Sequence, residues 1–131
     1  MNRNMEMRLE VVPLPVSDAD ASKAFYVDKV GFHLDHDVEP GNGIRVIQLT
    51  PPGSACSIVF GTGMGESAGD RDAVKNLHLV VDDIVAARKQ LEDSGVAVSG
   101  IDDMGGIKYA HFSDPDGNSW ALQEIGPRSC S

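Results

Sequence analysis

The chain has 131 residues, 41% of them hydrophobic and 24% charged, which is the balance of one ordinary globular domain, residues 1–131, with its own core. Its formal net charge of −9 argues against nucleic acid and anionic membrane surfaces as partners, because their phosphates would repel it. No apolar run has the length of a membrane span, and the N-terminus lacks the apolar core of a signal peptide. The two cysteines, Cys56 and Cys130, make no disulfide framework, so we expect a cytoplasmic protein.

The first half of the chain, from about residue 8 to 61, predicts the element order β-α-β-β-β. A strand over Leu9–Val16 carries two prolines two positions apart, which is typical of an edge strand. Ser17-Asp18 then begins a helix that runs to about Val30 and is ended by Gly31. Turn residues separate the next predicted strands, which are Phe32–Val38, Ile44–Thr50 and Cys56–Phe60.

The second half, from about residue 76 to 125, repeats this plan after a linker over residues 62–75 that is rich in glycine and acidic residues. Asp82-Asp83 begins its helix and Gly95 ends it. The predicted strands are Leu77–Val81, Val96–Ser99, Ile107–Phe112 and Ser119–Ile125, with a loose tail after them. A shift of 65 places Val16-Ser17-Asp18 on Val81-Asp82-Asp83, and such repetition of a supersecondary unit is a strong indication of fold.

The segment HLDHD in the second predicted strand resembles a set of metal ligands at first sight. At a period of two residues, His33, Asp35 and Asp37 share one face, while Leu34 and His36 share the other. We interpret this pattern as the outward face of an exposed strand.

Two segments carry a family resemblance: VSDADASKAFYVDKVGF at 16–32 and FSDPDGNSWALQEI at 112–125. Together with the internal repeat, they make the chain resemble the vicinal oxygen chelate superfamily. That superfamily includes glyoxalase I, bleomycin-resistance proteins, methylmalonyl-CoA epimerase and ring-cleaving dioxygenases. The resemblance implies an α+β fold in which two tandem βαβββ units form a curved mixed sheet around a cleft for a small molecule.

The resemblance also implies where a metal ion would bind, on the first and last strands of each unit. Counted from the motifs, these four positions hold Val11, Val59, Asn76 and Ala121. Three of these side chains have no donor atom, and Asn is a poor ligand for a transition metal. We therefore expect no standard metal site and no cofactor, which disfavours the family's metal-dependent chemistry.

Alternation along the strands predicts which side chains face the cleft. Glu124 lies at an odd offset from Ala121, so we expect it on the opposite face, toward solvent or a helix; Trp120 is expected in the core. Arg45 and Gln48 lie on opposite faces of their strand, and the sequence leaves open which one enters the cleft. Polar cleft residues form the predicted ligand-binding site: Asn76, His78, Tyr109, His111 and Gln123.

The leading hypothesis is a protein that binds a small organic molecule in the cleft between its units without a catalytic metal, as the bleomycin-resistance branch does. One alternative is a lyase, isomerase or dioxygenase that uses a displaced metal site at His78, His111 and Gln123. Acid–base chemistry by a histidine without a metal is also open. A third alternative is an interaction module that only dimerises; a homodimer is expected because the family often forms one. The acidic balance would suit a basic ligand.

Overall fold

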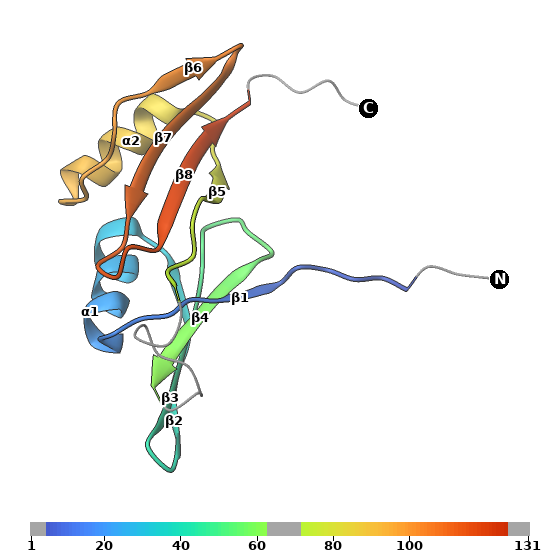
Figure 1. Cartoon of the computed structure of the whole chain (residues 1–131), viewed down its shortest axis with the longest axis vertical. Coiled ribbons are helices and arrows are strands. Elements are labelled where there is room, and N and C mark those ends of the chain that lie inside the picture. Colours follow the sequence, from blue (N-terminus) through green and yellow to red (C-terminus); the bar gives the residue numbers. More distant parts are fainter. Residues whose placement is uncertain (1–4, 63–71, 126–131) are drawn as a thin grey trace.

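The computed structural model describes residues 5–62 and 72–125. Most of the predicted linker, and the tail with Cys130, lie outside these residues. The described chain contains two βαβββ units, each with its own sheet of four strands, and the predicted α+β fold of two tandem units is confirmed (Figure 1). Within this part of the chain, no helix has both the length and the apolar character needed to cross a membrane.

Sheet one belongs to the first unit and has the strand order β1-β4-β3-β2. Its first strand is shorter than predicted, but it does lie at the sheet edge and pairs in parallel with β4. The predicted helix forms as α1, Ala19–Ala24, which continues directly into the π-helical segment η1, Phe25–Val30. The strands are β1 Val11–Pro13, β2 His33–Gly41, β3 Ile44–Thr50 and β4 Ser57–Thr62.

Sheet two belongs to the second unit and has the corresponding order β5-β8-β7-β6. Helix α2, Ile84–Asp93, lies against β7 and β8 (Figure 1). The strands are β5 Leu77–Val80, β6 Asp102–Met104, β7 Ile107–Ser113 and β8 Ser119–Glu124.

The predicted strand at Val96–Ser99 is wrong, and β6 takes its place in the sheet. The segment after α2 ends the helix and does not pair as a strand. Val96 is buried, and its N–H donates to the Leu91 carbonyl at 3.0 Å. The hairpin partner of β7 is instead β6, which lies later in the chain than the predicted strand. In the tight turn between β6 and β7, the side chain of Asp103 accepts a hydrogen bond from the Gly106 N–H.

The two helices begin in the same way, which confirms the repeat predicted from sequence. Asp18 and Asp83 each accept a hydrogen bond at 3.1 Å from the backbone N–H three residues later. Gly31 and Gly95 follow the helices with φ of 93° and 96°, a left-handed conformation that side chains other than glycine's adopt at a cost.

The D-P-D-G-N turn connects the two units through buried polar groups. Tyr26, on η1 of the first unit, donates its hydroxyl hydrogen to Asp114 Oδ2 at 2.7 Å and accepts from Trp120 Nε1 at 2.9 Å. Asn118 Nδ2 donates to the carbonyl of Pro15 at 3.0 Å. Apolar residues of both units surround these groups in one buried cluster. The turn is therefore part of the contact that joins the units.

A β-bulge in β2 changes which side chains share a face. The register with β3 shifts by one residue between Leu34 and His36. Leu34 pairs with Leu49, and Asp37 pairs with Ile47, so Leu34 and Asp37 lie on the core side of sheet one.

The prediction that His33, Asp35 and Asp37 share one face is therefore wrong. Asp37 points to the helix side, where Lys23 Nζ and Arg45 Nη2 lie 2.6 and 2.9 Å from its Oδ2. Asp35 remains on the opposite face of the sheet, where it accepts a hydrogen bond from the outward-facing β3 residue Thr50. The extra residue of the bulge accounts for the difference, because alternation cannot be counted across it.

Candidate functional site

Strand β8 has a core face and an open face. Trp120 is buried against Tyr26, while Ala121 and Gln123 point to the other side of the sheet. Glu124 lies on the helix side, because its Oε1 accepts from the N–H of Ile84 at the start of α2 at 2.8 Å. The predictions for Trp120 and Glu124 are both confirmed, and the open face is defined by Ala121 and Gln123.

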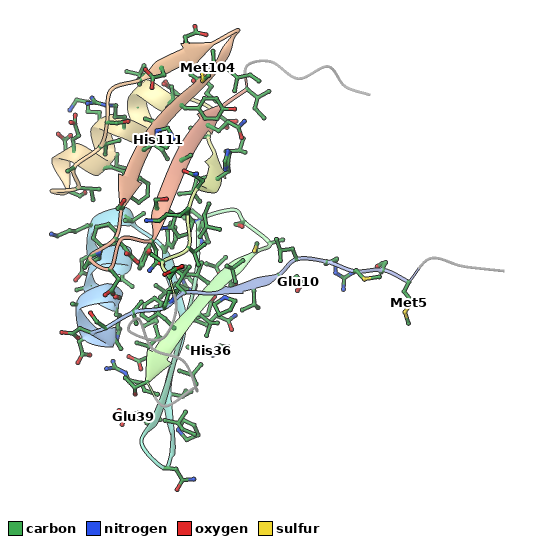
Figure 2. The ribbon with its side chains drawn as sticks, viewed as in Figure 1. Met5, Glu10, His36, Glu39, Met104 and His111 are labelled. Carbon is green, nitrogen blue, oxygen red and sulfur yellow. The ribbon has the colours of Figure 1, made fainter. Side chains whose placement is uncertain are left out.

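Two histidines stand on either side of Ala121 on this open face. His78 of β5 and His111 of β7 are both register partners of Ala121, so all three side chains share a face. Ala121 is 1% exposed, whereas His78 and His111 are exposed. His111 is labelled on the upper sheet in Figure 2. A small apolar side chain therefore forms the floor between two accessible imidazoles.

Tyr109 of β7 and Gln123 of β8 lie on the same open face, where they pair with each other two residues from His111 and Ala121. The ring of Tyr109 lies 6.1 Å from that of His78, edge to face, and 6.5 Å from that of His111, nearly parallel at 15°. Gln123 Nε2 donates to the Tyr109 hydroxyl at 3.2 Å. Four of the five predicted ligand-binding residues thus meet on one face. We refer to His78, Tyr109, His111 and Gln123 as the sheet-two cluster.

Asn76, the fifth predicted residue, enters the site through its backbone. It precedes β5 with a φ of 59°, and its N–H donates to Ser119 Oγ at 2.8 Å. Its carbonyl lies 2.7 Å from His78 Nδ1. Because a carbonyl only accepts, Nδ1 of His78 carries the hydrogen of this bond, and Nε2 takes no part in it.

A cavity of about 500 Å³ lies beside β5, and sequence reasoning missed it. Of the five predicted residues, only His78 lines it. Its walls come from the turn between β3 and β4 in the first unit and from α2 in the second, so no pattern within one strand indicates it. The lining includes Phe32, Pro51, Ser54, Val80, Gln90 and Leu91. His78 therefore borders both the cavity and the open face.

The structure decides between Arg45 and Gln48. The guanidinium of Arg45 donates to Asp37 and, at 2.6 Å, to Asp20 of α1, so it lies on the helix side. Gln48 lies on the opposite, open face of sheet one, where it pairs with Val59 of β4. Gln48 is thus the member of this pair available to a ligand on the open side.

The residues at the four expected metal positions do not fit a metal ion. The side chains of Val11, Val59 and Ala121 contain no nitrogen, oxygen or sulfur, and that of Asn76 offers only an amide. Among residues 5–62 and 72–125, no three His, Cys, Asp or Glu side chains are grouped so as to hold a metal. The residues at these four positions therefore cannot hold the metal ion that the family's metal-dependent reactions need.

Comparison with solved structures finds proteins that are similar to this chain over most of its length. TnmS3, described as an antibiotic binding protein from Streptomyces sp. CB03234, is 33% identical with a TM-score of 0.77, over 93% of this chain and 98% of TnmS3. A glyoxalase/bleomycin resistance protein from the same organism is 36% identical with a TM-score of 0.73, over 88% and 98% of the two chains.

A curated relative and a family model agree with these structures. An ethylmalonyl-CoA/methylmalonyl-CoA epimerase of Cereibacter sphaeroides is 31% identical over 100 residues, which cover 71% of this chain and 75% of the epimerase. The model of the Glyoxalase/Bleomycin resistance protein/Dioxygenase superfamily matches residues 8–122. The chain belongs to this superfamily.

Proposed function

We propose that the protein binds a small organic molecule on the open face of sheet two through the sheet-two cluster. The observation that carries the proposal is the exposed pair His78 and His111 around the buried methyl of Ala121, with Tyr109 beside both rings. Aromatic rings offer apolar contact area to an organic ligand. Nε2 of His78 and the amide of Gln123 offer hydrogen bonds that orient it.

The similarity to TnmS3 supports binding as the function, because that protein is described as antibiotic binding. For this chain we infer sequestration of a small molecule without chemical conversion. A ligand that extends from the open face past His78 would also reach the cavity beside β5. We further propose that the protein acts in the cytoplasm.

The test of this function begins with a thermal-shift screen of small aromatic molecules that carry polar groups. For a hit, we expect His78→Ala and His111→Ala each to weaken binding about tenfold, measured by calorimetric titration. The same changes should alter the free energy of unfolding by less than about 0.5 kcal/mol, because both side chains are exposed. Lys89→Ala removes an exposed side chain of α2 that does not line the cavity, and it should leave the affinity unchanged. Equal affinity in all three variants would contradict the proposal.

The similarity to an epimerase is the observation in support of the enzyme alternative. That alternative needs a metal ion, which the residues at the four expected metal positions of this chain do not ligate. We propose that the protein works without a catalytic metal. Elemental analysis of protein prepared without a histidine tag tests this directly. One bound transition metal ion per chain, retained through dialysis, would favour the displaced site at His78, His111 and Gln123 instead.

We also propose a homodimer, with a second copy covering the N-terminal segment. This segment extends away from the body of the molecule (Figures 1 and 2), and its apolar residues alternate with charged ones. The charged residues pair among themselves, since Arg8 lies 2.9 Å from Glu6 and 2.7 Å from Glu10. The apolar side chains are left in water, since Met5, Met7, Leu9 and Val11 are all exposed.

An extended segment with one apolar side, next to the edge strand β1, has the form of a strand that pairs with another chain. Analytical ultracentrifugation should give a dimer for the wild type. Met7→Glu with Leu9→Glu should shift the dimer toward a monomer, whereas Glu6→Gln should not. A wild-type monomer at micromolar concentration would contradict this part of the proposal.

A further inference from the structure

Two carboxylates on β2 are shielded from water to a similar degree but have different surroundings. The side chain of Asp37 is 18% exposed and that of Asp35 is 22% exposed. Asp37 accepts from Lys23 Nζ at 2.6 Å and from Arg45 Nε at 3.0 Å. These hydrogen bonds, that from Arg45 first, hold the pKa of Asp37 well below its usual range. Its charge is therefore neutralised within the protein.

Asp35 has no such partner among the described residues. No lysine or arginine in residues 5–62 and 72–125 lies within 4.0 Å of it. Its nearest basic group is His33 Nε2, 3.7 Å from Oδ1, on a side chain that is 75% exposed. A carboxylate that is largely removed from water without a cation beside it costs free energy, which a cationic ligand would recover.

The hydrogen bonds around Asp35 determine which hydroxyl group donates and which oxygen accepts. Thr50 Oγ1 donates to Asp35 Oδ2, and Thr50 Oγ1 also lies 2.6 Å from Ser57 Oγ. Each hydroxyl has one hydrogen, and a carboxylate only accepts. Since the hydrogen of Thr50 goes to Asp35, Ser57 must donate to Thr50. The oxygen of Ser57, on a residue 7% exposed, is left with acceptor capacity only.

All three groups face the open side of sheet one. Ile58 and Phe60 of β4 are buried in the core, so Ser57 and Val59 point the other way. Thr50, like Gln48, alternates with the buried residues of β3. The open face of sheet one thus presents acceptor oxygens beside the apolar side chain of Val59.

We propose that Asp35, Thr50 and Ser57 form a second binding subsite that takes a protonated amine of the ligand. The proposal rests on the proposed function, since it specifies the chemistry of the molecule bound. An ammonium group has three donors and no acceptor, which complements Asp35 Oδ1 and Ser57 Oγ, and its charge compensates that of Asp35. The net charge of −9 would attract such a ligand at long range.

Benzylamine and benzoate are suitable probes, because they share an aromatic ring and carry opposite charges at pH 7. In amide-resolved NMR titrations of the full chain, benzylamine should give saturable shifts at Asp35, Thr50 and Ser57, and benzoate should not. Asp35→Asn should weaken benzylamine binding about tenfold or more, through loss of a charge-assisted hydrogen bond. Ser57→Ala should weaken it about threefold, because the carboxylate remains.

Glu39→Gln is the matched control, because it removes one negative charge from an exposed position of the same strand (Figure 2). It should leave benzylamine affinity unchanged. The subsite is refuted if Asp35→Asn and Glu39→Gln have equal effects, if benzoate binds as well, if the shifts spread over the acidic surface, or if benzylamine does not bind. The amide spectrum of each variant reports whether it is folded. A negative result here leaves the His78 and His111 test standing, because that test concerns the other sheet.

Discussion

The two faces of β8 differ in what holds their side chains. On the core face, Trp120 donates to the hydroxyl of Tyr26, and Glu124 accepts from the first turn of α2. On the open face, the side chain of Gln123 makes one hydrogen bond within residues 5–62 and 72–125, at 3.2 Å to Tyr109. Neighbouring residues of one strand thus have separate tasks: one set joins the units, and the other is free to meet a ligand. Substitutions on the two faces should therefore separate stability from binding.

The largest effect is expected at Asp114, which is 6% exposed and belongs to the core side. Its Oδ1 accepts from the N–H groups of Asp116 and Asn118, and its Oδ2 accepts from Tyr26 and from the Asn118 side chain. Asp114→Ala leaves these donors without a partner, so it should lower the free energy of unfolding by roughly 3–5 kcal/mol in urea denaturation. Asp103→Ala, at an exposed turn, should cost less than about 1 kcal/mol. Equal losses would show that the D-P-D-G-N turn is only a hairpin turn.

Tyr26→Phe should have the next largest effect, about 1–2 kcal/mol at neutral pH. Burial, and then the carboxylate of Asp114, raises the pKa of Tyr26 far above its ordinary value of 10.0. Above about pH 10 the unfolded chain loses this proton while the folded chain keeps it, so wild-type stability falls as the pH rises. The difference between wild type and variant should therefore shrink from pH 8 to 11. A constant difference across this range would contradict a buried, neutral Tyr26.

Glu124→Ala should cost about 1 kcal/mol, because it removes the acceptor for the N–H of Ile84 at the start of α2. Ligand affinity should stay the same, since Glu124 lies on the helix side. Thermal unfolding with ligand titration on the same sample measures both quantities. A loss of affinity without a loss of stability would place Glu124 in the binding site.

Gln123→Ala, one residue away, should show the opposite result and the smallest effect on stability, below about 0.5 kcal/mol. It removes one partner of Tyr109 on the open face, so ligand affinity should fall about threefold. The pair Gln123→Ala and Glu124→Ala is the sharpest comparison of the two faces. It fails if both changes affect the same property.

Much of the fold could be predicted from local patterns. Asp18 and Asp83 before the helices, and Gly31 and Gly95 after them, are short-range signals, and each appears in the structure as expected. Alternation from the D-P-D-G-N turn also gave the correct faces for Trp120 and Glu124, because β8 is regular over its whole length. The same counting brought His78, Tyr109, His111 and Gln123 together on one face.

Patterns failed where long-range packing decides the outcome. Nothing in the sequence of β2 indicates the bulge after Leu34, which depends on the pairing with β3. The cavity beside β5 has walls from both units, so it exists only once they pack. The partnership of Tyr26 with Asp114 spans 88 positions of the chain, and neither residue reveals the other.

The bulge in β2 has a consequence for transferring knowledge between relatives. A homologue whose strand has the same length but pairs without a bulge would present its counterparts of Asp35 and Asp37 on the same side of the strand. A gap-free alignment would then equate residues that face the ligand with residues that face a helix. Insertions and deletions within this strand should therefore change binding preference more than many substitutions, because one residue of length alters the face of every side chain beyond it.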